Sequence, residues 1–527
     1  MFDRNGPLKI TTTAAVAALL AGCSLLPGGD SDEEQSIAVG TTSAPSVLDP
    51  AGAWDQSWEL FRNVYQTLTT FTNSSGKPDP EAAKSCRFTD SESKVYRCTL
   101  RKGLKFSNGD PVNAEAVRFS LQRVLDIDAD SGPADLLGSL DRVETPDHRT
   151  VVFHLKKSDA TFPYVLATPA ASLVNPAVYP GDALLEGNNI SGSGPYELAG
   201  YKANKRAVLA RNPSYKGTAE VQNETVTIRY FPGDSSGMVQ AFKDGAVDVT
   251  FRGLTPKQIR GFQESSADGN DNVELTEIAG KEIRYLVFNP KFEWAGNEAV
   301  RKAVAELIDR KALTRNVYDR TAEPLYSMVP AGIAGHTNAF FEAYGEPSRE
   351  KAEQTLREAG ITQKVPLTLW YTTDRYGSTM KKEFEEIARQ LNGSGLFDIT
   401  VKGRPWNEYQ KAYEEYPVFG RGWFPDFPDA DTYVSSFVGK SNVFNIPYDT
   451  PKITGKLLPE SRKEGDRGIA SGIFADAQTI LAQDARLLPL WQGKVYVAAH
   501  KDIAGVEWSI DPSTIMRMWE LKRKASW

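Results

Sequence analysis

Cys23 is the residue whose surroundings indicate its chemistry most directly. A start that carries Arg4 and Lys9 leads into an apolar stretch of about 11 residues, and then Leu-Ala-Gly precedes Cys23. This order is typical of a secretory signal, and it is shorter than the roughly 20 residues of a membrane-spanning helix. The cysteine resembles that of a bacterial lipobox, whose thiol is lipidated. We predict a lipoprotein signal peptide over 1–22 and a flexible acidic tether over 23–36. An ordinary signal peptide that happens to contain a cysteine is the alternative.

Cys86 and Cys98 indicate a second kind of thiol chemistry. They stand 12 residues apart, with the turn-like Thr-Asp-Ser-Glu-Ser between them and an alternating, strand-like Val-Tyr-Arg-Cys-Thr-Leu around Cys98. A hairpin brings such residues opposite one another, and an exported chain can oxidise them. We therefore predict a disulfide; two separate buried thiols are the alternative.

Other catalytic or metal-binding patterns are scarce. The chain has no HExxH, CxxC or GxxxxGK[ST], and its four histidines stand in unrelated contexts. Carboxylates are plentiful, yet no pair stands out as the two groups of a hydrolase. We expect no metal site, no cofactor and no catalysis, and a secreted hydrolase is kept as an alternative.

Helices and strands alternate along the chain. Asn113 and Ser348 can each cap an amphipathic helix, and Gly360 can end the second of these. Apolar spacing predicts further helices around Val300–Ile308 and over residues 380–391 and 469–481. Strand-like runs occupy residues 151–155, 226–231, 367–371 and 399–401. The mixture indicates an α/β protein.

Composition supports a globular chain of several domains. Of its 527 residues, 40% are hydrophobic and 24% are charged, which is neither disordered nor membrane-spanning in character. The length allows two to four domains. The formal net charge of −7 argues against a nucleic-acid binder.

A family resemblance begins at Tyr96–Asp126 and recurs in order down the chain. It first comprises a strand ending in Leu100-Arg101, a turn with Lys105-Phe106, the turn Gly109-Asp110-Pro111 and a helix capped by Asn113. Further segments follow: Gly192-Ser193-Gly194-Pro195-Tyr196, Arg211-Asn212-Pro213-Ser214-Tyr215, Ala241–Asp248, Phe288-Asn289, Val300–Ala303 and Ile308-Asp309-Arg310. Together they resemble the family 5 extracellular solute-binding proteins of bacterial ABC importers, which bind oligopeptides, dipeptides or nickel.

The resemblance implies a two-lobed, periplasmic-binding-protein-like fold (type II, cluster C) with an extra small domain and a ligand cleft between the lobes. Lobe I is expected from residues 37–77, 192–285 and 495–527, the extra domain from 78–191, and lobe II from 286–494. The chain then crosses between the lobes twice, which makes a hinge that a ligand can close.

Asp426 is the implied ligand anchor. The segment Arg421–Ala430 resembles the family's Trp-x-x-Asp stretch, in which the Asp three residues after the Trp pairs with the α-amino group of a bound peptide. Asp426 occupies that position after Trp423. A carboxylate suits a desolvated ammonium, which needs charge-assisted hydrogen bonds. The alternative is that Asp426 only caps a turn between Pro425 and Pro428, which crowd it.

Aromatic side chains and one arginine complete the implied site. Trp423 and Trp406 match family tryptophans that line the cleft, although either could be ordinary core. Arg421 could bind a ligand carboxylate, with a surface ion pair as an equal alternative. Cleft contacts are also expected near Trp54 or Trp58, beside a structural Asp49-Pro50.

The implied function is that of a lipid-anchored receptor on the outer face of the cell membrane. It would capture an oligopeptide and deliver it to ABC permease subunits that a cytoplasmic ATPase drives, and it would act as a monomer. Two alternatives share the fold: binding of an oligosaccharide or a nickel–chelator complex, and a regulatory envelope lipoprotein that does not transport.

Overall fold

One large mixed sheet runs through the molecule. The computed structural model describes residues 36–72, 76–268, 272–377 and 379–524. Across the sheet the strands follow in the order β15 (Phe397–Arg404), β14 (Val365–Thr372), β16 (Val418–Trp423), β12 (Val273–Phe288), β17 (Leu487–His500), β11 (Val249–Phe251), β1 (Ser36–Thr41), β10 (Thr225–Tyr230), β9 (Arg206–Arg211) and β8 (Tyr196–Lys202). A further strand, β13 (Ala322–Pro324), pairs with β17.

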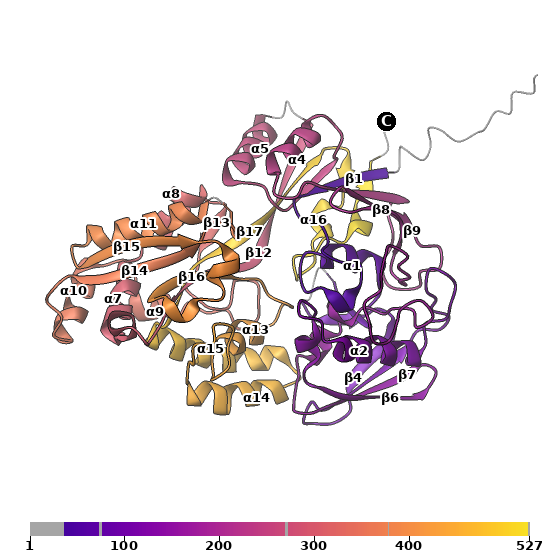
Figure 1. Cartoon of the computed structure of the whole chain (residues 1–527), viewed down its shortest axis with the longest axis horizontal. Coiled ribbons are helices and arrows are strands. Elements are labelled where there is room, and N and C mark those ends of the chain that lie inside the picture. The colour runs from indigo at the N-terminus through magenta and orange to yellow at the C-terminus, as the bar shows by residue number, and fades with distance from the viewer. Residues whose placement is uncertain (1–35, 73–75, 269–271, 378, 525–527) are drawn as a thin grey trace, which may run out of the picture.

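Two long antiparallel strands, β12 and β17, connect the two lobes. The first half of β12, Val273–Ala279, pairs with β17 alone. The second half, from Ile283 onward, pairs with β17 on one side and with β16 on the other. The register shifts between Ala279 and Ile283, so the ladder is interrupted between the two halves. Figure 1 shows the two strands crossing from the orange lobe on the left to the lobe on the right. The crossing has the form of a hinge, because few backbone bonds must change for the lobes to rotate.

The first lobe is built around β1, β8, β9, β10 and β11. Its buried core joins residues from both ends of the chain, including Val39, Phe61, Val249 and Trp519. The other elements of this lobe are α1 (Trp58–Val64), α4 (Ser235–Lys243), α5 (Pro256–Asp268), β18 (Ile503–Ala504), α16 (Val506–Ser509) and β19 (Lys522–Arg523). The strands β2 (Thr69–Phe71) and β3 (Pro78–Pro80) pair with each other, and Phe71 of β2 belongs to the core of the neighbouring extra domain.

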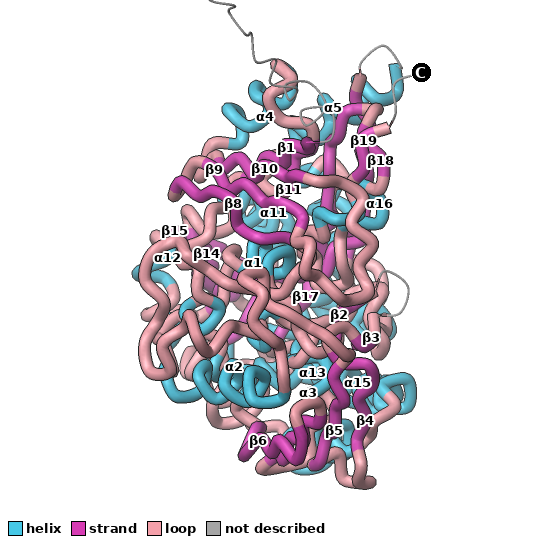
Figure 2. Tube along the Cα trace, turned by 90° about the vertical axis from the view of Figure 1, so that its right-hand side faces the viewer, coloured by secondary structure: helices cyan, strands magenta, loops and turns pink. Residues whose placement is uncertain are grey.

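An extra domain lies beside the first lobe and has a separate four-stranded sheet in the order β4-β5-β7-β6. Its elements are β4 (Ala83–Phe88), β5 (Val95–Leu100), α2 (Ala114–Ile127), β6 (Leu140–Asp147), β7 (Thr150–Leu155) and α3 (Phe162–Val165). Figure 2 shows this sheet at the end of the molecule opposite β1. Cys86 and Cys98 face each other across β4 and β5 and form the predicted disulfide.

The second lobe packs helices against β14, β15 and β16, around a core that includes Phe384, Tyr433 and Leu487. Its helices are α6 (Glu293–Gly296), α7 (Glu298–Leu307), α8 (Arg310–Tyr318), α9 (Ala339–Tyr344), α10 (Arg349–Glu358), α11 (Thr379–Gly393), α12 (Trp406–Tyr409), α13 (Asp431–Val434), α14 (Leu458–Lys463) and α15 (Arg467–Asp484). Together these parts give the predicted two-lobed α/β architecture.

The helices and strands predicted from apolar spacing are confirmed. Asn113 caps α2 by accepting a hydrogen bond from the Ala116 amide, and Ser348 caps α10 in the same way. Gly360 follows α10 with a φ of 75°, as a glycine that ends a helix does. The predicted strands correspond to β7, β10, β14 and β15.

The predicted signal peptide, Cys23 and nearly all of the tether lie outside the described residues. In the parts of the chain that the structure describes, no helix combines the length and the apolar character that crossing a membrane requires. The lipid anchor therefore stays a prediction from the sequence.

Candidate functional site

A cavity of about 480 Å³ lies between the two lobes. Its wall combines residues from both lobes: Trp54, Asp55, Gln56, Trp58, Glu59, Arg252, Ser513, Thr514 and Ile515 of the first, and Arg375, Tyr376, Trp406, Arg421, Gly422, Trp423, Phe424, Pro425, Asp426 and Val443 of the second. A solute inside it would touch both lobes at once.

The four residues predicted to bind ligand are brought together here. Trp406, Arg421, Trp423 and Asp426 all line this one cavity. Trp54 and Trp58 of the first lobe, where cleft contacts were expected, line it as well, although Trp58 is largely buried. Ligand binding by these residues stays a prediction.

Strand topology explains why these segments meet. In the second lobe β14 is parallel to both β15 and β16, and the cavity residues Tyr376 and Trp406 follow the carboxyl ends of β14 and β15. Trp423 ends β16, and Asp426 follows three residues later. In the first lobe Arg252 directly follows β11, which is parallel to β1. Open α/β sheets bind their ligands at this edge, beyond the carboxyl ends of the strands.

Asp426 is a half-buried carboxylate without a cationic partner in the described part of the chain. Its Oδ1 accepts a hydrogen bond of 3.1 Å from Nε1 of Trp54, on the opposite lobe. Burial raises the pKa of Asp426 to about 7, because the low-dielectric surroundings disfavour the charged form more than the Trp54 hydrogen bond favours it. A bound cation would reverse that balance.

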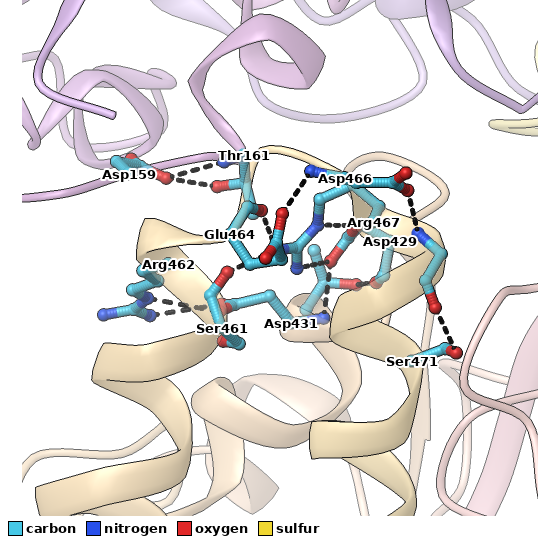
Figure 3. A network of polar contacts seen from close by, with 12 residues as sticks. Asp159, Thr161, Asp429, Asp431, Ser461, Arg462, Glu464, Asp466, Arg467 and Ser471 are labelled. Carbon is cyan, nitrogen blue, oxygen red and sulfur yellow. Dashed lines mark hydrogen bonds and ion pairs between the residues drawn. The ribbon is translucent and has the colours of Figure 1, made fainter. Parts of the chain in front are cut away.

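Ion pairs hold the chain just after Asp426. Asp429 and Arg467 make two hydrogen bonds of 2.8 Å, and both side chains are buried. Asp431 accepts two hydrogen bonds of 3.1 Å from Arg462, and Figure 3 shows both pairs above the helices of the second lobe. Charge-assisted pairs of this kind restrict the loop that follows Asp426, and their side chains do not line the interlobe cavity.

Phe427 points away from the cavity and into the extra domain. It is 5% exposed and belongs to the apolar core of that domain, where its ring lies 5.8 Å from the ring of Tyr164. Pro425 and Pro428, which were expected to crowd Asp426, flank Asp426 and Phe427 in the sequence. Pro425 lines the cavity, and Asp426 still reaches Trp54. Asp426 and Phe427 are thus adjacent in the chain, but Asp426 lines the cavity and Phe427 packs in the core of the extra domain.

Arg421 is surrounded by aromatic rings and neutral oxygens. Its Nη1 donates to the hydroxyl of Tyr413 at 2.8 Å and to the carbonyl oxygen of Val443 at 3.2 Å. The guanidinium also lies 5.7 Å from the ring centre of Trp406 and 5.6 Å from that of Phe444. Arg421 takes part in none of the ion pairs found between described residues, and its role at the cavity stays a prediction.

Several cavity residues were missed by the sequence analysis. Arg252 donates to Glu59 at 2.6 Å and to the carbonyl oxygen of Thr514 at 2.7 Å, which joins three distant segments of the first lobe. Arg375 is exposed and lies 5.3 Å from the ring centre of Trp406. The positions of Arg252 and Arg375 just beyond strand ends were a usable signal, whereas nothing in the sequence marked Thr514.

The sequence also contains one pattern that can indicate a hydrolase. Gly233–Gly237 fits Gly-x-Ser-x-Gly, which in some hydrolases carries the nucleophilic serine. Here the segment begins α4, and Asp234 caps that helix by accepting a hydrogen bond of 2.8 Å from the Gly237 amide. These residues are not among those that line the interlobe cavity. The pattern is therefore explained by the start of a helix.

Metal ligands are not gathered at the site. Within the described ranges, no group of three or more His, Cys, Asp or Glu side chains is placed to hold a metal ion. The cavity side chains include the carboxylates of Asp55 and Asp426, neither of which forms an ion pair among the described residues, together with guanidinium groups and several aromatic faces, which suit a polar organic solute.

Comparisons with known proteins indicate a family and a fold for this chain. Residues 77–445 match the family model of bacterial extracellular solute-binding proteins, family 5 (middle part). The periplasmic oligopeptide-binding protein OppA of Haemophilus influenzae is 26% identical over 522 residues, which cover 92% of this chain and 93% of that protein. The dipeptide-binding protein DppE of Bacillus subtilis is 24% identical, with 87% of each chain covered. The solved structure of HbpA2 from Haemophilus parasuis superposes with a TM-score of 0.79 at 20% identity, over 93% of this chain and 100% of the other.

Proposed function

Because the chain belongs to the bacterial extracellular solute-binding proteins of family 5, we propose that it captures oligopeptides in the interlobe cavity and delivers them to an ABC permease. In this proposal the protein is held by a lipid on Cys23 at the outer face of the cell membrane. It makes and breaks no bond in its ligand, and the energy for transport comes from the ATPase of the permease complex. The relatives named for oligopeptide and dipeptide binding support this ligand class.

Asp426 is the observation that carries the proposal. It is a carboxylate in the wall of the cavity, its pKa is raised to about 7 by burial, and no cation among the described residues compensates it. The α-amino group of a peptide is a compact cation with three donors. It would supply the missing charge and leave the Trp54 hydrogen bond to Oδ1 in place, because Oδ2 remains available.

The aromatic wall suits ligands with varied side chains. Trp54 and Phe424 are 38% and 44% exposed in the described structure, unusually open for such large apolar groups, and they face the cavity from opposite lobes. Trp406 and Trp423 add two further flat surfaces. Rigid aromatic faces can accept different apolar groups without needing a fixed hydrogen-bond pattern. Main-chain groups of an extended peptide can then supply the affinity that all peptides share.

Capture requires the two lobes to close on the ligand. Asp426 belongs to the second lobe and Trp54 to the first, so a ligand at Asp426 touches both only when the lobes are together. The ligand therefore stabilises the closed arrangement by its contacts with both lobes, and the β12–β17 connection permits the motion.

Native mass spectrometry of the protein purified gently from its own cells tests this proposal. A soluble form that lacks residues 1–23 would be isolated, and co-purifying masses would be released by denaturation and sequenced. A set of short peptides is the expected result. A single non-peptide mass, such as an oligosaccharide or a metal–chelator complex, would replace the ligand class. An empty protein that also ignores a peptide library in a thermal-shift screen would favour the regulatory alternative.

A further inference from the structure

The outer face of the extra-domain sheet carries two arginines directly opposite each other. Arg87 of β4 and Arg97 of β5 are cross-strand partners, and both side chains are exposed. Cys86 and Cys98, the next pair of the same ladder, point to the other face, where Cys98 belongs to the buried core. Like charges directly opposite each other on adjacent strands are destabilising. The arginine pair is therefore not explained by the stability of the sheet.

The carboxylates near this pair are engaged with other groups. Glu144 of β6 accepts hydrogen bonds of 3.1 and 3.2 Å from Arg142. Asp90, in the turn between β4 and β5, accepts hydrogen bonds from two backbone amides where β5 begins. Arg87 and Arg97 take part in none of the ion pairs found between described residues. An anion from outside the chain would supply their counter-charge.

Three lysines extend the positive charge into a groove beside the sheet. The groove has a volume of about 560 Å³ and lies between the extra domain and the second lobe. Lys94, which precedes β5, and Lys156 and Lys157, which follow β7, line it and take part in no ion pair between described residues. Glu92 in the same wall pairs with Lys463 at 2.9 Å. We define the basic surface as Arg87, Lys94, Arg97, Lys156 and Lys157.

Positive charge is concentrated in this part of an acidic protein. Residues 84–105 hold seven Lys or Arg and two Asp or Glu, whereas the whole chain has a formal net charge of −7. A local excess of one sign raises the concentration of counter-ions at that part of the surface. Because the charges extend over two strands and a groove, they suit an extended polyanion better than a single small anion.

Phosphate is the anionic group that suits an opposed pair of arginines. The planar fork of arginine binds phosphate oxygens through two N–H donors. A phosphodiester keeps two free oxygens that share one negative charge, so it can accept from Arg87 and Arg97 at once. Further phosphodiesters of the same chain can then meet the lysines.

The position of the basic surface favours a polymer over the membrane. Ser36, where the described chain begins, lies in β1, and the extra-domain sheet lies at the opposite end of the molecule (Figure 2). A body that is held by a lipid on Cys23 would present this end away from the bilayer. The choice of a polymer over a lipid headgroup therefore rests on the proposed anchor.

We propose that the basic surface of the extra domain binds a linear, phosphodiester-bearing polymer of the cell envelope. All five residues of the surface belong to the extra domain, so the contact does not require the lobes to close. It is also separate from the interlobe cavity, because none of the five lines that cavity. The polymer holds the body of the protein in the envelope while the cavity stays free for its ligand.

Fluorescence anisotropy of end-labelled inorganic polyphosphate tests the proposal. Each internal group of this probe carries one charge on two free oxygens, as a phosphodiester does. The soluble form that lacks residues 1–23 keeps every described residue and is used throughout. It should bind polyphosphate at low salt and release it as the ionic strength rises. Labelled polyglutamate of similar length should bind at least tenfold more weakly, because it offers carboxylates in place of phosphates.

Two double variants and a matched control assign the binding to its residues. Arg87→Gln with Arg97→Gln should weaken polyphosphate binding at least tenfold, and Lys156→Gln with Lys157→Gln should weaken it severalfold. The control, Arg349→Gln with Arg357→Gln, removes two exposed charges from α10, where both arginines pair with Glu353, and should bind within twofold of the unmodified protein. Melting temperatures show whether each variant is folded. If the Arg87 and Arg97 variant does not fold, the lysine variant decides the question.

The outcomes separate the surface, the chemical group and the source of the polyanion. Absence of polyphosphate binding, or equal losses in the arginine variant and the control, would overturn the basic surface. Equal affinity for polyglutamate would overturn the preference for phosphate. Co-sedimentation with vesicles of phosphatidylglycerol and phosphatidylcholine that is lost in the arginine variant would assign the surface to lipid headgroups and overturn the polymer. Peptide binding should be unchanged in every variant, so the proposed function stands or fails independently.

Discussion

The indole nitrogen of Trp54 donates a hydrogen bond of 3.1 Å to Oδ1 of Asp426, and the two residues are 372 positions apart in the chain. This contact joins the first lobe to the second at the cavity wall. It orients the carboxylate and stabilises its charged form only in part, because the pKa of Asp426 is still raised to about 7. The carboxylate is thus positioned before any ligand arrives and lacks a cation to neutralise it.

Removal of the negative charge of Asp426 should weaken the binding of peptides with a free amino group more than the binding of acetylated peptides. In Asp426→Asn, peptides with a free amino terminus should bind roughly 10- to 100-fold more weakly, because a hydrogen bond between charged groups is lost. N-acetylated peptides should be affected far less. Calorimetric titration of the same peptide in both forms measures the difference. Asp398→Asn, an exposed change on β15, serves as the control, and equal losses for both peptide forms would remove the anchor role.

Peptide affinity should also depend on pH in a defined direction. The ammonium of the ligand requires an ionised Asp426, whose pKa lies near 7, while the α-amino group stays protonated below about pH 7.7. Affinity should therefore fall roughly 20-fold between pH 7.5 and pH 5.5, as Asp426 takes up a proton. Titrations at several pH values measure how the affinity depends on pH. The affinity of an acetylated peptide should change little with pH, and an affinity for the free peptide that does not change with pH would contradict the raised pKa of Asp426.

The same carboxylate should reduce the stability of the empty protein at neutral and alkaline pH. The pKa of Asp426 is about 7 in the folded state and about 3.9 when unfolded, so the folded state holds its proton more tightly. Stability is then lost as pH rises from about 4 to 7 and is not regained above that range. Asp426→Asn lacks this loss, and its unliganded form should melt roughly 1–2 °C higher than the unmodified protein at pH 8. Near pH 4 the two should melt together, and a variant that melts lower at pH 8 would contradict the expectation.

Local structure was predictable because it follows from neighbouring residues. Asn113 and Ser348 were recognised as helix caps, and the Cys86–Cys98 pair was placed on a hairpin by its own flanking sequence. Trp423 and Asp426 were indicated by the resemblance of one short segment, at the end of β16, to the family's Trp-x-x-Asp stretch. The caps, the disulfide and this resemblance all depend on residues that are close together in the chain.

Contacts between distant segments were not predictable in this way. Arg252 and Glu59 are 193 positions apart, and Trp54 meets Asp426 only because β12 and β17 bring the lobes together. Phe427 lies in a short segment between Pro425 and Pro428, and nothing in the neighbouring sequence indicates that its side chain belongs to the core of another domain. A single amino-acid sequence contains no record of such pairings.

The predicted lipid anchor can be tested without any structural change to the body of the protein. Cys23→Ala should move the protein from the membrane fraction to the soluble fraction, because no thiol remains to be lipidated, and a single acyl chain already contributes about 0.8 kcal/mol per buried CH₂ group. Cell fractionation with immunodetection measures the shift. The melting temperature should be unchanged, and retention in the membrane fraction would mean that another segment holds the protein there.

Phe427 should control how readily the lobes close. Its ring is buried in the extra domain, while its neighbour Asp426 lines the ligand cavity. The adjoining interface has polar contacts as well, since the Ala160 amide donates to the Arg462 carbonyl oxygen at 2.8 Å. Replacing a buried phenylalanine by alanine typically costs about 3–5 kcal/mol, and here that cost falls on the arrangement in which the second lobe touches the extra domain. Phe427→Ala should therefore populate open forms.

Small-angle scattering with and without peptide measures this opening. The radius of gyration of unliganded Phe427→Ala should exceed that of the unmodified protein, and saturating peptide should bring it back toward the closed value. Peptide affinity should fall by roughly tenfold, because part of the binding free energy is spent on closure. Phe341→Ala removes the same ring from an exposed position on α9 and should change neither quantity. If Phe427→Ala leaves both the scattering and the affinity unchanged, Phe427 stabilises only the loop that carries it, and closure depends on the polar contacts at the interface and on the ligand itself.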